Sequence, residues 1–87
     1  MNNRITVNKE VNVTAVYFQS QGMKTFPRRM EFDGDTYTFA DGLQYLIKKG
    51  QDMVQIFDMT DGAASYRLKR DGNHANWTLV AITPSGA

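Results

Sequence analysis

Hydrophobic and polar residues alternate along most of this chain, in short segments separated by turn-forming residues. In segment 65–70, Tyr66 and Leu68 alternate with polar residues, which is typical of a β-strand with one buried face. Segments 11–19 and 52–59 carry apolar residues on both faces over much of their length. Such two-sided segments are expected of central strands that are covered on both sides.

Asp-Gly pairs recur four times between these segments. A tight hairpin turn needs positive φ at both central residues, which Gly accepts freely and Asp tolerates. The pairs are Asp33-Gly34, Asp41-Gly42, Asp61-Gly62 and Asp71-Gly72, and Gly50 marks a further turn. Turn signals at intervals of about 8 to 12 residues are typical of a chain of short antiparallel strands. We therefore predict a mainly β protein, a small antiparallel barrel or a strongly curled sheet of 5–7 strands.

The segment 43–49 fits two structures. Leu43, Leu46 and Ile47 share one face of a short helix, which an Asp-Gly pair would begin and a Gly would end. As a strand, Leu43, Tyr45 and Ile47 alternate with polar residues, but Leu46 breaks the pattern. Both a strand and a short helix near 43–49 stay open, and in the helical case only three Asp-Gly pairs form hairpin turns.

The length of 87 residues fits one domain, residues 1–87, whose ends at 1–3 and 84–87 are expected to fray. A hydrophobic content of 41 % is too high for a disordered protein. The absence of cysteine excludes disulfides, thiolate zinc sites and cysteine nucleophiles. Stability must then come from packing, from good turns or from a partner subunit.

Charge and hydropathy argue against a membrane protein. No window approaches the roughly 18 apolar residues that span a bilayer, and the polar N-terminus lacks the apolar core of a signal peptide. The net charge of +1 does not indicate a nucleic acid or a membrane surface as partner. We expect a soluble, cytoplasmic protein without a membrane partner.

The residues on which most active sites depend are missing or isolated. The only histidine, His74, lies in a turn-like segment without a motif around it. Carboxylates cluster near Glu31, Asp33 and Asp35, but turn composition explains them and they do not match a calcium-binding loop. The glycines are scattered and form no phosphate-binding loop. We predict no enzyme activity, no metal and no cofactor.

Surplus apolar surface is the feature that indicates a function. A small barrel has one inner face to fill, so strands that are apolar on both faces need cover, which a second subunit can supply. The candidates for this contact are Phe18, Met53, Phe57 and Met59. Methionine suits an adaptable contact surface, although it more often fills gaps in a core. We predict a non-catalytic binding module for a protein partner or for itself.

An alternative is a small β-barrel that binds single-stranded nucleic acid. Such barrels combine basic side chains with aromatic rings on which bases stack. The basic candidates are Lys24, Arg28, Arg29, Lys48, Lys49 and Arg70, and the stacking candidates are Phe26 and Tyr45. No RNP motif and no run of exposed aromatic residues accompanies them.

Three segments in order, FPRRMEFDGDTYTF, DGAASYRL and WTLV, resemble certain small uncharacterised bacterial β-rich proteins. In those proteins a strand that begins with proline leads through a turn to an aromatic strand. The resemblance covers residues 26–82 and implies a β-rich fold. It implies no activity and transfers no functional residue.

Overall fold

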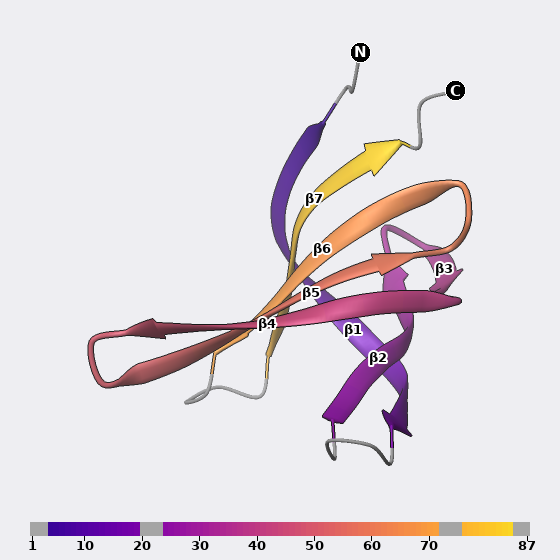
Figure 1. Cartoon of the computed structure of the whole chain (residues 1–87). Coiled ribbons are helices and arrows are strands. Elements are labelled where there is room, and N and C mark those ends of the chain that lie inside the picture. Colours follow the sequence, from indigo (N-terminus) through magenta and orange to yellow (C-terminus); the bar gives the residue numbers. More distant parts are fainter. Residues whose placement is uncertain (1–3, 20–23, 72–75, 85–87) are drawn as a thin grey trace.

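The computed structural model describes residues 4–19, 24–71 and 76–84. These residues form seven β-strands and no helix (Figure 1). The strands are β1 (Ile5–Gln19), β2 (Lys24–Phe32), β3 (Asp35–Thr38), β4 (Asp41–Lys49), β5 (Asp52–Thr60), β6 (Ala64–Asp71) and β7 (Trp77–Pro84). Neighbours in the sheet are antiparallel, and the strand order is β3-β2-β1-β7-β6-β5-β4. The prediction of a mainly antiparallel β protein is confirmed.

The segment 43–49 lies within strand β4, so the alternative of a short helix there is wrong. β4 pairs with β5 along its whole length, from Asp41 opposite Thr60 to Lys49 opposite Asp52. Leu46, which breaks the alternation, lies on the core-facing side of β4 but is 59 % exposed. The reason is that the β4–β5 hairpin projects beyond the rest of the sheet, as Figure 1 shows.

Three of the predicted turns occur. Asp33 and Gly34 both have positive φ, 56° and 85°, in the turn between β2 and β3. Gly50 has a φ of 64° between β4 and β5, and Gly62 has a φ of 95° between β5 and β6. Positive φ is the conformation for which glycine is preferred. The pair at 71–72 extends beyond the described residues.

The pair Asp41-Gly42 is not a hairpin turn but the start of β4. The chain passes from β3 to β4 through Phe39 and Ala40. The Phe39 amide donates to the Arg28 carbonyl at 2.8 Å, and the Ala40 amide donates to the Thr60 carbonyl at 2.8 Å. Residue 39 is thus bonded to β2 and residue 40 to β5, so the chain passes from the one strand to the other without a tight turn.

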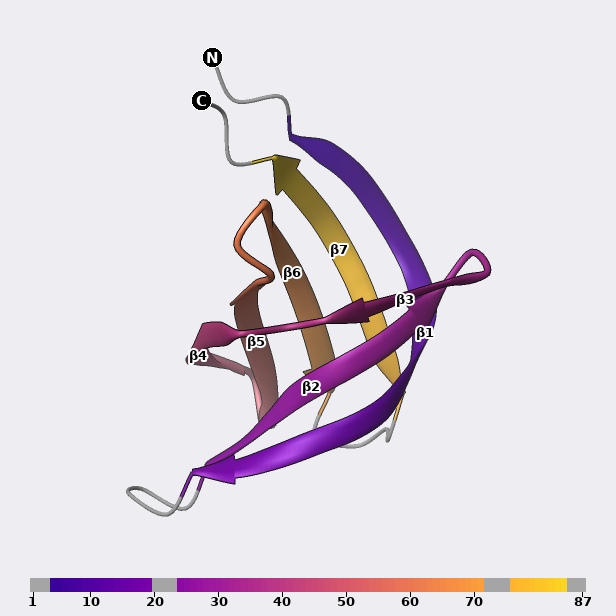
Figure 2. The same ribbon diagram turned by 90° about the vertical axis from the view of Figure 1, so that its right-hand side faces the viewer.

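The sheet is strongly curved and is not closed. β1 pairs with β7 through its first half and with β2 through its second half. Irregularities in the register lie near Asn8, which has a φ of 51°, and at Ala15. Bulges of this kind bend a strand and increase its twist. Figure 2 shows β2 and β3 crossing over the layer of β5, β6 and β7. The closed barrel of the sequence prediction is not formed by the described strands, which end at β3 and β4.

The core lies between these two parts of the sheet. Its largest fully buried side chains include Phe39, Phe57, Met30, Met59, Leu68 and Leu79. Tyr66, which the sequence pattern places on the buried face of its strand, is buried, and so is Trp77. Aromatic rings connect the two parts of the sheet, since Phe57 contacts Phe26 at a centroid distance of 5.9 Å and Trp77 at 5.1 Å.

Asp61 organises the turn between β5 and β6. Its Oδ1 accepts from the amides of Ala63 and Ala64 at 2.8 and 2.9 Å, and its Oδ2 accepts from the Tyr66 hydroxyl at 2.9 Å. Burial raises the pKa of Asp61, but these hydrogen bonds outweigh burial and hold the pKa below its ordinary value. Burial and the bond to Asp61 raise the pKa of Tyr66.

The variant Asp61→Asn is therefore expected to be less stable than the native chain at neutral pH. Because the pKa of Asp61 is lower in the folded state, its charge stabilises the fold above the unfolded pKa of about 3.9. This contribution is lost as the pH falls through the folded pKa, so the two proteins should converge in acid. Urea unfolding across this pH range measures the difference. A stability gap that stays constant down to the lowest pH would contradict the role of the charge.

Candidate functional site: the edge strand β4

The two edges of the sheet differ in how they are protected. β3 has only four residues and pairs with the second half of β2. The first half of β2, which β3 does not cover, contains Pro27, and proline has no amide proton to donate. Short strands and proline are ordinary means by which proteins prevent pairing at a sheet edge. This edge is therefore a poor template for another strand.

β4 lacks this protection. It has nine residues without proline, and the topology gives it β5 as its one hydrogen-bonded neighbour among the described strands. Four large hydrophobic side chains on it are exposed: Leu43 at 61 %, Tyr45 at 45 %, Leu46 at 59 % and Ile47 at 51 %. A long edge strand with exposed apolar residues is a site at which another chain can pair.

The register with β5 shows which way these side chains face. Gly42 lies opposite Met59 and Gln44 opposite Phe57, so even-numbered residues of β4 face the core. Side chains alternate between the two faces of a strand. The odd-numbered residues therefore lie on the outer face.

We call the apolar part of this outer face the β4 patch. Tyr45 lies opposite Ile56 and Ile47 opposite Val54, and both β5 residues are half-buried. The β4 patch consists of Leu43, Tyr45, Ile47, Val54 and Ile56.

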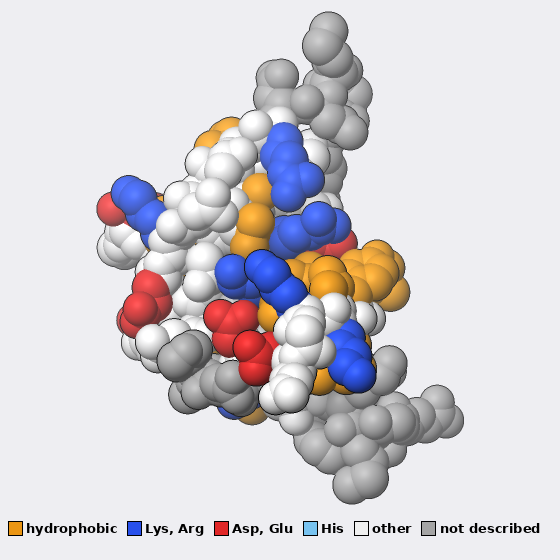
Figure 3. Space-filling view, turned by 90° about the vertical axis from the view of Figure 1, so that its left-hand side faces the viewer, with side chains coloured by type: hydrophobic (Ala, Val, Ile, Leu, Met, Phe, Trp, Pro, Cys, Tyr) orange, Lys and Arg blue, Asp and Glu red, His pale blue; other side chains and the backbone are white. Residues whose placement is uncertain are grey.

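A shallow depression lies at the edge of the β4 patch. It has a volume of about 390 Å³ and is lined by Tyr45, Leu46, Ile47, Ile56 and Arg67. Arg67 forms two hydrogen bonds with Asp58, Nε to Oδ1 at 2.7 Å and Nη2 to Oδ2 at 2.8 Å. This pairing holds the pKa of Arg67 above its ordinary value. In Figure 3, Lys and Arg side chains lie close to hydrophobic ones, with acidic side chains on the same face.

The two ends of β4 carry opposite charges. Asp41 and Lys49 are both exposed, and both are odd-numbered residues on the outer face. The Asp41 Oδ1 accepts from the Gly42 amide at 2.8 Å, and Lys49 lies opposite Asp52 in the hairpin. The exposed apolar side chains of β4 thus have an acidic residue at one end and a basic residue at the other.

The residues predicted for protein contact are only partly at the surface. Met53 is 47 % exposed on the projecting hairpin. Phe57 and Met59 are 1 % and 0 % exposed, so their prediction as surface contacts is wrong. They fill the core because the second half of β1 and strand β2 fold over this face of β5. The Phe18 side chain lies outside the described residues.

Sequence reasoning missed Leu43 and Ile47 as contact residues. The available signal was the strand alternation of Leu43, Tyr45 and Ile47, which placed three large apolar residues on one side. That pattern did not show which side faces solvent.

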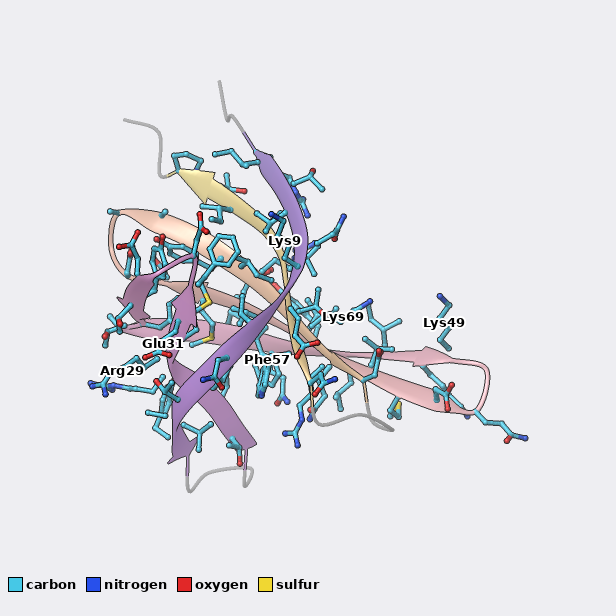
Figure 4. All side chains as sticks on the ribbon, turned by 180° about the vertical axis from the view of Figure 1, so that it is seen from behind. Lys9, Arg29, Glu31, Lys49, Phe57 and Lys69 are labelled. Atoms are coloured by element: carbon cyan, nitrogen blue, oxygen red, sulfur yellow. The ribbon has the colours of Figure 1, made fainter. Side chains whose placement is uncertain are left out.

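The predicted nucleic-acid residues do not form one groove. Arg28 and Arg29 are exposed on β2, whereas Lys48 and Lys49 are exposed at the end of β4. Figure 4 shows Arg29 and Lys49 on opposite sides of the molecule. The side chain of Lys24 lies outside the described residues.

The aromatic and remaining basic candidates are also separated in role. Phe26 is 5 % exposed and stacks on Tyr17 at a centroid distance of 5.3 Å, so the prediction that it offers a face to a base is wrong. Arg70 is half-buried, with its guanidinium 5.4 Å from the centroid of the Trp77 ring. Tyr45 is exposed but belongs to the β4 patch.

Other candidate sites carry less. A polar depression of about 210 Å³ is lined by Arg4, Asp58, Ser65, Arg67, Ala81 and Thr83. Its Arg67 is already paired with Asp58. Within residues 4–19, 24–71 and 76–84, no three His, Cys, Asp or Glu side chains gather as metal ligands would. His74 lies outside these ranges.

Comparisons with protein-family models, with curated proteins and with solved structures found no match. The resemblance to small bacterial β-rich proteins stays a prediction. The part of the chain that the structure describes contains no helix with the length and apolarity to cross a membrane.

Proposed function

We propose that this protein is a non-catalytic binding module that recognises another polypeptide through strand β4. The observation that carries the proposal is a nine-residue edge strand, paired with β5 on one side and with no other described strand, which exposes Leu43, Tyr45 and Ile47 on one face. In this mode of recognition, an extended segment of the partner adds a strand to the sheet.

The backbone of β4 supplies one part of the affinity. A strand that is paired on one side leaves alternate amide and carbonyl groups free to pair on its other side. Each backbone hydrogen bond that forms with a partner contributes about 0.5–1.5 kcal/mol net of the bonds to water that it replaces. These bonds do not depend on sequence, so they give affinity without selectivity.

The side chains supply selectivity. An added strand places its own side chains beside the β4 patch. Each Å² of apolar surface that is buried there stabilises the complex by about 25 cal/mol. Asp41 and Lys49 at the two ends distinguish partners by charge. An extended, apolar partner segment with a basic and an acidic end fits this surface.

Site-specific photo-crosslinking in the cells that produce the protein tests the proposal. A photoreactive residue at position 47 is expected to give covalent adducts, because Ile47 is exposed on the β4 patch. The matched control is position 36, since Thr36 is exposed on the other edge strand, β3. Equal adducts at both positions, or none at position 47, would contradict binding through β4.

Binding of single-stranded nucleic acid, the alternative from the sequence, has less support because its basic residues lie apart. We expect a mixed oligonucleotide at low salt to leave the amide resonances near Arg29 and Lys49 unchanged in an NMR titration. Concerted, salt-sensitive shifts at both residues together with Tyr45 would favour the alternative instead.

A further inference from the structure

The β4 edge is complementary to itself, and we propose that its partner is a second copy of this chain. The two β4 strands pair antiparallel about a two-fold axis at Tyr45 and join two sheets into one. This inference rests on the proposed function, because it names the partner of the same edge.

The register about Tyr45 brings unlike charges and like side chains together. Asp41 lies opposite Lys49 of the second copy, Leu43 opposite Ile47, and Tyr45 opposite Tyr45. By symmetry the Asp41–Lys49 and Leu43–Ile47 pairs each occur twice, and the Tyr45 pair occurs once on the axis, as expected of an interface between identical surfaces. Opposite charges, aromatic pairs and aliphatic pairs at facing positions all stabilise neighbouring strands.

The same register keeps the β4 patch on one face of the joined sheet. Odd-numbered residues face odd-numbered residues, so the two exposed rows of Leu43, Tyr45 and Ile47 become one apolar surface across both copies. On the inner face, Gly42 lies opposite Lys48 and Gln44 opposite Leu46 of the second copy. This face introduces no pair of like charges.

Other registers lose these contacts. A shift by one residue brings an outer position of one copy beside an inner position of the other, because side chains alternate along a strand. A shift by two residues places Lys49 opposite Leu43, or Asp41 opposite Ile47. A parallel, in-register arrangement places Lys48 beside Lys48 and Lys49 beside Lys49 of the second copy, so like charges meet. The register at Tyr45 is the one that satisfies both the charges and the apolar row.

The self-pairing also answers two physical needs of this chain. An open apolar edge strand can associate with other chains without limit, whereas a two-fold pair covers the β4 edges of both copies at once. The domain is small and has no cysteine, so burial against a second copy adds stability that a disulfide cannot supply.

Charge reversal at the two ends of β4 tests the register by sedimentation velocity. Asp41→Lys alone creates two Lys–Lys pairs per dimer, and Lys49→Asp alone creates two Asp–Asp pairs. Each single variant is expected to raise the dimer dissociation constant about tenfold or more. An equimolar mixture of the two variants restores two opposite-charge pairs, and so does the double variant. Both are expected to regain dimerisation.

Matched controls separate the register from other effects of charge. Lys48→Asp changes the net charge as Lys49→Asp does, but it faces Gly42 of the second copy and is expected to dimerise nearly as the native chain does. Lys49→Asp also places a carboxylate opposite Asp52 within the hairpin, so thermal unfolding of each variant is compared. The neutral variants Asp41→Asn and Lys49→Gln weaken the pair without repulsion and test the register if a reversal variant fails to fold.

Two outcomes would overturn the inference. One is a native chain that stays monomeric at millimolar concentration, and the other is a mixture of the two single variants that does not dimerise better than either alone. Adducts from position 47 to a different protein would then leave the proposed function in place while removing self-pairing. Absence of adducts from position 47 would remove both.

Discussion

Phe57→Ala is expected to lower the free energy of unfolding by about 3–5 kcal/mol. The Phe57 side chain is 1 % exposed, and its ring contacts Phe26 of β2 and Trp77 of β7. It therefore joins the two parts of the curved sheet, and its loss leaves a cavity between them. Since domains of this size are marginally stable, a loss of this magnitude removes much of the total.

Urea unfolding followed by the fluorescence of Trp77, the single tryptophan, measures this loss. Met53→Ala on the same strand is the control, because Met53 is 47 % exposed and its truncation is expected to change stability by about 0.5 kcal/mol or less. Equal effects of the two substitutions would contradict a core role for Phe57 and would favour its predicted role as a contact residue at the surface.

Gly42→Ala is expected to lower the free energy of unfolding by about 1–3 kcal/mol. A Cβ atom at position 42 would meet the Met59 Sδ, would approach the Met59 Cε to 2.7 Å and would lie 3.0 Å from the Asp58 carbonyl oxygen. Met59 is fully buried, so its side chain has little room to move away. Without a clash, the same substitution would stabilise the protein by about 0.4–1 kcal/mol, because alanine lowers the conformational entropy of the unfolded chain. The sign of the effect is therefore diagnostic.

A double-mutant cycle isolates the contact between the two strands. In a Met59→Ala background the space opposite position 42 is open, so Gly42→Ala is expected to lose most of its effect. If the substitution is equally destabilising in both backgrounds, the clash with Met59 is not its cause. Because the close approach of Gly42 to Met59 positions β4 against β5, Gly42→Ala is also expected to weaken binding at the β4 edge.

Local patterns predicted much of the fold. The alternation of Tyr66 and Leu68 with polar residues identified inward positions on β6, and the pairs at Asp33-Gly34 and Asp61-Gly62 marked turns between strands. These predictions succeed because the side-chain period of a strand and the need for positive φ act within a few residues. Neither depends on where the rest of the chain lies.

The candidate site depended on information that no local pattern holds. Strand β5 is apolar on both faces, and the sequence did not show that Phe57 and Met59 face the core while Val54 and Ile56 lie outside. That choice is made by β1 and β2, which fold over one face of β5. Residues far apart in the sequence must meet before either face is covered.

The sequence by itself determined the class of structure, three of its turns and the absence of cysteine chemistry. Only the tertiary structure decided that β4 is an edge, that its Leu43 and Ile47 face solvent, and that Arg29 lies far from Lys49. Turns and alternation are short-range properties of the backbone and its neighbouring side chains. Strand order follows instead from long-range pairing, from the bends of β1 near Asn8 and Ala15, and from the point at which the curved sheet stops.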